Sequence, residues 1–256
     1  MRGQTITSLP NAESVAEQAD DAVLARAFED HVRDAEFPCV GAKSALARGT
    51  LQTVVCHDLT SGWDDLRIHR ELLNWSSDYA DELKDAEEFA ETSGRPMTPP
   101  QFRSLAFIFR NAPAMQEAEF EKHLWTRLQS LADKDVWLEQ DYDDTVSPDP
   151  DDPHFGLSFG GQAYFVVGMH AAASRPARRF QRPVLVFNLH DQFEQLRTMG
   201  RYERLRSAIL DRDVALAGDV NPMLARHGER SEAAQYSGRK VGGEWQCPFS
   251  DKRADT

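Results

Sequence analysis

His170 is the histidine of this sequence whose neighbours most suggest a binding site. It ends an apolar run, Ala163 to Met169, that predicts a strand, and a stretch of small residues follows it. Three guanidinium groups come next in the chain, those of Arg175, Arg178 and Arg179. A neutral imidazole in this setting could hold the iron of a porphyrin whose carboxylates pair with the arginines. The alternative is a histidine that caps backbone groups, beside arginines in surface salt bridges.

Cys39 is the second candidate for a metal ligand, and it lies in the motif Phe-Pro-Cys-Val-Gly. A thiolate bound to heme iron donates electron density and favours O–O cleavage. The alternative is a buried cysteine that packs as a small apolar side chain. Cys56, inside a β-rich run, and Cys247, near the C-terminus, are expected to belong to the core.

Polar side chains also gather where another apolar run ends. Asn188 and His190 close the run that starts at Val184, just before a predicted helix. Strand ends that lead into helices are common places for ligand contacts. His227 and the stretch 231–239 form two further polar clusters. The alternatives are a helix cap at Asn188 with an exposed His190, and an ordered surface loop. The motifs of P-loop, dinucleotide-binding, zinc-protease and serine-hydrolase sites are missing.

The composition is that of a soluble globular protein, with 41% hydrophobic and 28% charged residues among 256. A net charge of −13 argues against a nucleic-acid partner and favours a cationic substrate through long-range attraction. No apolar run approaches the ~20 residues of a membrane span, and no secretory signal is visible. Three cysteines without a CxxC pair predict a cytoplasmic protein with reduced thiols.

The alternation of helical and strand patterns predicts an α+β fold, a single domain with a mixed or antiparallel β-sheet flanked by helices. Helical spacing occurs in 21–34, 63–79, 117–131 and 191–210, and strand patterns occur in 51–59, 105–109, 155–159, 163–169 and 184–189. Residues 1–20 are expected to form a flexible tail, and residues 21–256 the heme-binding catalytic domain considered below. The acidic, proline-bearing segment 141–153 predicts a loop or a lid that would concentrate a cationic substrate.

Several strings follow one another as they do in the YqcI/YcgG family, which the chain resembles over roughly residues 28–250. These strings are Phe37 to Cys39, Phe165 to Arg182, Phe187 to His190, Gln192 to Arg197, Asn221 to Leu224, Ser231 to Arg239 and Trp245 to Phe249. Members of that family include heme-dependent N-hydroxylases of guanidine groups, of the kind used in D-cycloserine and guanitoxin biosynthesis. The chain looks closest to the branch with a histidine at the strand end, here His170.

The resemblance implies a heme b (iron protoporphyrin IX) without thioether links, which agrees with the absence of a C-x-x-C-H motif. It also implies an O2-dependent monooxygenase that converts L-arginine to Nω-hydroxy-L-arginine in antibiotic biosynthesis, with electrons from an external donor. His170 ranks first as the axial ligand and Cys39 second, with the propionates on Arg175, Arg178 and Arg179. The groups expected to supply distal hydrogen bonds are Asn188, His190 and His227. The substrate candidates are Glu194, Asp213 and Glu232 for the guanidinium, and Arg239 for the α-carboxylate.

Two functions of other classes stay open at this point. A non-catalytic heme sensor or carrier fits because the sequence shows no reductase domain. A heme-free member of the family that binds a cationic metabolite fits the acidic composition. Assembly into a homodimer also stays open.

Overall fold

Strands β2 (Ser104–Phe109) and β5 (Val184–Leu189) form the centre of the sheet because both are apolar on both faces. A computed structural model describes residues 12–224 and 228–255. The sheet has five strands in the order β1-β2-β5-β4-β3. The other strands are β1 (Leu51–Cys56), β3 (Leu157–Phe159) and β4 (Gln162–Met169). Strand β1 pairs parallel with β2, and the remaining pairs are antiparallel, so the predicted α+β fold with a mixed sheet is confirmed.

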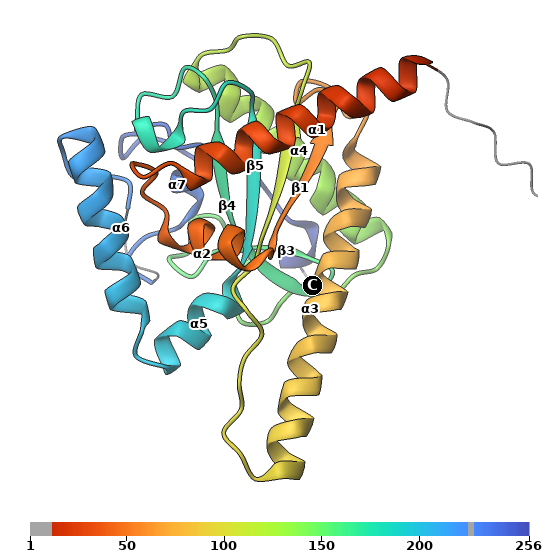
Figure 1. Ribbon diagram of the computed structural model, residues 1–256, viewed down its shortest axis with the longest axis vertical. Helices are drawn as coiled ribbons and strands as arrows, with labels where there is room; N and C mark the ends of the chain where they lie inside the picture. Colours follow the sequence, from red (N-terminus) through yellow and green to blue (C-terminus); the bar gives the residue numbers. More distant parts are fainter. Residues whose placement is uncertain (1–11, 225–227, 256) are drawn as a thin grey trace, which may run out of the picture.

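Helices cover both faces of this sheet (Figure 1). Leu105 and Phe107 of β2 pack with Leu72 in the core under α3 (Asp65–Ser93) and α4 (Glu117–Trp137). Ala106 and Ile108 point the other way, into a second core under α1 (Ala12–Arg33) and α2 (Val40–Arg48). This alternation follows from the two-residue period of a strand, and it buries both faces.

Helix α1 begins at Ala12, inside the segment 1–20 that was expected to be a tail; residues 1–11 lie outside the described part. Helix α2 was not predicted, because Pro38 reads as a helix break. The break is in fact a helix start: the Cys39 side chain caps α2 and accepts a hydrogen bond from the Ala42 amide.

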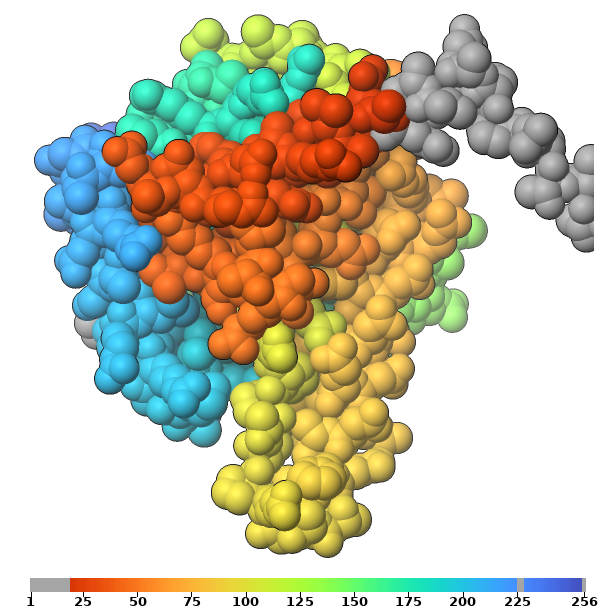
Figure 2. All heavy atoms as spheres, in the orientation of Figure 1, coloured from red at the N-terminus to blue at the C-terminus, as the bar shows by residue number. Residues whose placement is uncertain are grey.

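Helix α3 was predicted to end near Tyr79 but runs to Ser93. Its second half leaves the body of the protein as an arm, together with the loop that returns to β2 (Figures 1 and 2). Beyond Tyr79 the helix is mostly exposed, and its apolar stripe narrows to Leu83, Ala86 and Ala90, one large and two small side chains that are partly buried. Good helix-forming residues such as Ala, Glu, Leu and Lys sustain it instead.

The glycine pair Gly160 and Gly161 makes the predicted hairpin turn between β3 and β4. Both residues have positive φ, 60° and 71°, as a two-residue hairpin turn of type I′ requires. After β4 ends, the chain passes through the short 3-10 helix η1 (Pro176–Arg178) and then enters β5.

The predicted helix 191–210 is divided in two by Gly200, which has φ 66°. Helix α5 (His190–Thr198) starts directly at the end of β5, and α6 (Tyr202–Ala217) follows the glycine. The short helix α7 (Ala233–Tyr236) packs against β4, and η2 (Lys252–Asp255) lies near the C-terminus. Within the described ranges, no helix is both long and apolar enough to cross a membrane.

Gly168 of β4 lets α4 approach the sheet closely. A Cβ atom at this position would lie 2.7 Å from Phe120 Cε1 and 2.8 Å from Leu124 Cδ1. We expect Gly168→Ala to destabilise the protein by about 1–3 kcal/mol, because the packed side chains of Phe120 and Leu124 cannot move away from the new methyl group without strain. Urea denaturation of the variant measures this loss. Gly242→Ala is the control, since nothing lies within 4 Å of its Cβ position; equal stability of both variants would contradict the close packing.

Candidate functional site

His170 lies at the end of β4, buried with 2% of its surface exposed. Its ring stacks on Phe120, with the ring centres 4.4 Å apart. Its Nδ1 atom is buried and has no hydrogen-bond partner among the described residues. Burial lowers the pKa of His170, so the imidazole is neutral at physiological pH. The neutral ring and its unpartnered Nδ1 suit an iron ligand in their chemistry, because iron binds a ring nitrogen in the plane of the imidazole and the stacked Phe120 covers only one face.

The three arginines that follow His170 are all bound to protein groups. Arg178 donates to the backbone carbonyls of Gly168, Gln235 and Tyr236. Burial lowers the pKa of Arg178 to about 10. Arg179 donates to the carbonyls of Ala173 and Ser174, and Arg175 binds Asp213 and Asp219. The arginines were expected to bind heme propionates, but their hydrogen bonds connect segments of the protein instead.

Cys39 caps α2, and burial raises the pKa of its thiol. Cys39 and the three arginines are thus bound to protein groups, so the heme site expected around His170 is not formed in this structure as predicted.

A hollow beside the segment that follows His170 is lined by a different imidazole, that of His31 on α1. It lies between α1 and the segment 171–181, with Ala171 and Arg179 in its lining. Asp30 and Asp34 also line it, and their carboxylates would repel propionates. This hollow does not fit a heme either.

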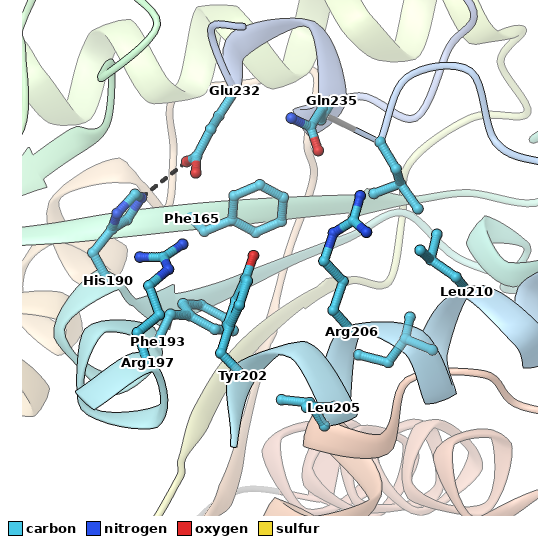
Figure 3. Close-up of a pocket in the computed structure, with 12 residues that line it drawn as sticks. Phe165, His190, Phe193, Arg197, Tyr202, Leu205, Arg206, Leu210, Glu232 and Gln235 are labelled. Carbon is cyan, nitrogen blue, oxygen red and sulfur yellow. Dashed lines mark hydrogen bonds and ion pairs between the residues drawn. The ribbon is translucent and has the colours of Figure 1, made fainter. Parts of the chain in front are cut away.

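A better-formed pocket lies at the opposite end of the sheet, where β5 leads into α5 (Figure 3). Its volume is about 150 Å³, which suits a small molecule, since a cavity of roughly this size holds benzene. Residues from β4, α5, α6, α7 and the segment before α7 line it: Phe165, His190, Phe193, Arg197, Tyr202, Leu205, Arg206, Ile209, Leu210, Leu224, Glu232 and Gln235.

The strand register separates this pocket from His170. Leu189 pairs with Tyr164, and Val184 pairs with Met169, so β4 and β5 end at opposite edges of the sheet. At ~3.3 Å per residue, His170 and His190 are roughly 20 Å apart. The structure does not bring the expected axial and distal groups together.

Two kinds of polar group face each other across the pocket. His190 Nε2 lies 2.9 Å from Glu232 Oε2, and both side chains are buried. In Figure 3 this pair lies on one side of Phe165, and the Arg206 guanidinium lies on the other. Arg197 pairs with Glu194 and sits 4.3 Å from the centre of the Tyr202 ring.

Arg206 is the more available of the two guanidinium groups. It makes no hydrogen bond or ion pair with any other residue that the structure describes. The lining holds two arginines and one glutamate, and Arg197 is paired with Glu194 outside the lining. Arg206 and Glu232 therefore remain as opposite charges in the pocket, which favours a ligand that carries both an anionic and a cationic group.

Of the residues predicted from sequence, His190 and Glu232 lie in this pocket and bind each other. Asn188 lies nearby on β5, but its side chain accepts a hydrogen bond from Ser104 Oγ. Glu194 is exposed on α5 outside the lining. His227 lies outside the described residues.

Asp213 and Arg239 are bound to other protein groups. Asp213 binds Arg175, and Arg239 binds the buried carboxylate of Glu121. Nor does the acidic segment 141–153 line the pocket; Asp143 instead accepts a hydrogen bond from the Ala163 amide.

Sequence reasoning missed Arg206, Tyr202 and Arg197. The available signal was the helical stripe that contains Leu205 and Ile209, which was assigned to the core. That stripe lines the pocket instead. Its neighbours on the same face of the helix, Tyr202 and Arg206, were therefore the better candidates for ligand contacts.

The arrangement can hold a small zwitterion. A buried carboxylate binds a cationic group, a guanidinium binds an anionic group, and the apolar lining between them shields both from water.

Comparison with known families gives one match. The model of the YqcI/YcgG family matches residues 28–250, most of the chain. No curated protein and no solved structure matches the chain. The chain therefore belongs to the YqcI/YcgG family.

Proposed function

We propose that this protein is an enzyme that binds a guanidino amino acid, with L-arginine as the first candidate, and hydroxylates a guanidino nitrogen. The observation that carries the binding half of this proposal is the buried Glu232–His190 pair opposite Arg206. The hydroxylation half rests on the family resemblance alone.

Glu232 is the partner of the substrate guanidinium in this proposal. One oxygen of the Glu232 carboxylate lies 2.9 Å from His190 Nε2, which fixes the carboxylate in the pocket lining. Guanidinium–carboxylate pairs are planar and often bidentate, which orients the nitrogen that reacts. Arg206 receives the α-carboxylate, and Phe165 and Leu205 contact the methylene chain.

The same pair can handle the proton that the reaction displaces. A guanidinium nitrogen must give up a proton before its electron pair is available to an oxidant. Glu232 accepts this proton, and the bond to His190 Nε2 orients the carboxylate and shares the charge.

The oxidation itself requires O2, electrons and a redox cofactor, which by the family resemblance is heme b. Cys39 and the arginines first assigned to heme are bound to protein groups, so the proposal assigns none of them to the cofactor. The same misfit favours a second candidate function, a heme-free protein that binds a guanidino metabolite without oxidising it. Incubation with L-arginine, O2 and a reductase distinguishes the two, because only the enzyme forms hydroxyarginine.

The absorption spectrum tests the assignment of heme ligands. The family resemblance predicts a Soret band in purified protein from cells supplied with iron and a heme precursor. We expect Cys39→Ala to keep that band unchanged, since the Cys39 side chain caps a helix. Loss of the band in His170→Ala would assign the iron to the unpartnered imidazole, and loss in Cys39→Ala would show that the thiol leaves its capping position.

Titration calorimetry with three ligands tests the binding proposal. L-Arginine should bind most tightly. Agmatine lacks the carboxylate for Arg206, and L-norleucine lacks the guanidinium for Glu232, so each should bind at least about tenfold more weakly. Equal affinity for L-arginine and agmatine would remove Arg206 from the proposal, and equal affinity for L-norleucine would remove Glu232.

A further inference from the structure

Helix α6 forms one wall of the pocket, yet it is weakly attached to the protein. It contributes Tyr202, Leu205, Arg206, Ile209 and Leu210 to the lining. Among its sixteen residues, only Asp213 is buried. The helix lies along one edge of the molecule (Figures 1 and 2). A surface helix normally gains its stability by burying an apolar stripe, and here that stripe faces a cavity.

The one buried residue of α6 makes its strongest attachment. Asp213 is bound in a bidentate manner by Arg175. The Nε atom of Arg175 lies 3.2 Å from Oδ1 of Asp213, and its Nη2 atom lies 2.5 Å from Oδ2. The same guanidinium binds the side chain and the backbone carbonyl of Asp219, just beyond the end of α6. The Arg175 and Asp213 side chains are only 10% and 5% exposed. A charge-assisted pair is roughly twice as strong as a neutral hydrogen bond, so this pair is a specific attachment of the helix.

Both ends of α6 are glycines in the left-handed region. Gly200 has φ 66° and Gly218 has φ 84°, and nothing lies within 4 Å of the Cβ position of either. Residues at the ends of an element are where hinges absorb changes in backbone angles, and glycine does so without steric cost.

We propose that Arg175 and Asp213 form a latch that holds α6 closed over the pocket, and that α6 swings about Gly200 and Gly218 when the latch opens. With α6 in this position the pocket has a volume of about 150 Å³ and stays partly open to solvent. In this proposal the latch limits how far the α6 wall can move outward, and so the size of the molecule that the site accepts. Arg175 and Asp213 are positioning residues, because they act through the wall that carries Tyr202 and Arg206.

Cysteine labelling measures the opening without any ligand, so its result is independent of the proposal about L-arginine. Leu205→Cys places a thiol in the pocket wall, and mass spectrometry separates its reaction with N-ethylmaleimide from that of the three native cysteines. We expect Asp213→Asn to raise the labelling rate at position 205 by at least about tenfold. Asp213→Glu, which keeps the carboxylate, should restore slow labelling.

Two further observations separate a swinging helix from a melted one. Asp211 is exposed on the same helix, so Asp211→Asn is the matched control and should leave the labelling rate unchanged. Hydrogen exchange in the middle of α6 should stay slow in Asp213→Asn, because the helix moves as a unit. Equal labelling of Asp213→Asn and its parent, or fast exchange throughout α6, would overturn the proposal. If Leu205→Cys does not fold, Phe193→Cys on α5 provides the same readout.

Discussion

Replacing Glu232 with glutamine is expected to weaken the binding of L-arginine by roughly 10- to 100-fold. A hydrogen bond to a charged group contributes about 1.5–3 kcal/mol, and each 1.4 kcal/mol changes affinity tenfold. Glutamine keeps the shape of the side chain and can still bond to His190 Nε2, so the fold should be preserved. Titration calorimetry of the two proteins measures the difference.

Glu194→Gln is the matched control for this prediction. Glu194 was an equal candidate in the sequence, but its side chain is 52% exposed and lies outside the pocket lining. Its replacement should change the affinity less than threefold. If Glu194→Gln weakened binding as much as Glu232→Gln, the cationic group of the ligand would not bind at Glu232.

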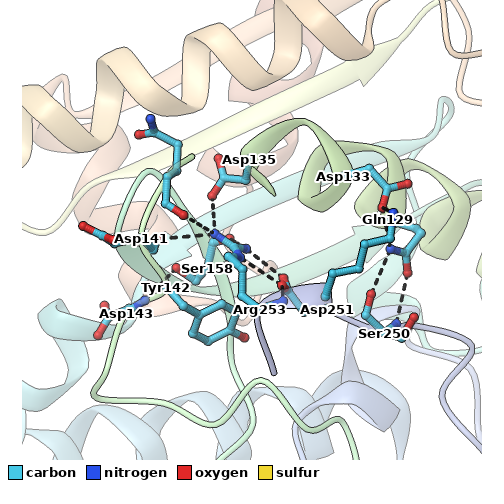
Figure 4. Close-up of polar contacts among 12 residues, drawn as sticks. Gln129, Asp133, Asp135, Asp141, Tyr142, Asp143, Ser158, Ser250, Asp251 and Arg253 are labelled. Atoms are coloured by element: carbon cyan, nitrogen blue, oxygen red, sulfur yellow. Dashed lines mark hydrogen bonds and ion pairs between the residues drawn. The ribbon is translucent and has the colours of Figure 1, made fainter. Parts of the chain in front are cut away.

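The second large effect concerns stability, at Asp135 of α4. This carboxylate is fully buried and accepts hydrogen bonds from His69 Nε2 at 2.6 Å, from the Gly160 amide at 3.0 Å and from Arg253 Nη1 at 2.8 Å. Arg253 also donates to the carbonyl of Ser158, so the C-terminal segment is tied to the β3–β4 hairpin (Figure 4). We expect Asp135→Asn to lower the free energy of unfolding by about 1.5–3 kcal/mol, because three donors lose their charged acceptor, while Arg253 keeps Asp251 as a counterion.

Chemical denaturation of Asp135→Asn and Asp133→Asn measures this contribution. Asp133 lies on the same helix, but it is half exposed and its bond to Lys252 is 3.5 Å long. Exposed pairs of this kind contribute at most about 1 kcal/mol. Similar stability of the two variants would mean that the buried network contributes no more than a surface pair.

The strands could be predicted from the sequence because each is a short apolar run with clear turn signals. Gly160 and Gly161 even located the hairpin. Helix boundaries were harder, since Gly200 divides a continuous helical pattern and Pro38 precedes a helix start. The arm of α3 carries only a narrow apolar stripe, Leu83, Ala86 and Ala90, which the prediction did not include.

The candidate site was only partly predictable, for a reason that lies in strand direction. His170 and His190 each end an apolar strand, and the pattern of one strand does not tell which edge of the sheet it reaches. The antiparallel pairing of β4 and β5 places them at opposite edges. The same limit explains Asp213: its carboxylate was assigned to a substrate guanidinium, and it binds the guanidinium of Arg175. The residue type predicted a carboxylate–guanidinium pair, but only the structure shows that the guanidinium belongs to Arg175.

Hydrogen exchange with and without saturating L-arginine tests the central claim, that the substrate site lies between α5, α6 and α7. The account predicts slower exchange in residues 190–217 and 232–236, which carry most of the lining, and no change in residues 170–179. Protection centred on 170–179 would return the site to His170, and the absence of protection anywhere would contradict the binding of L-arginine.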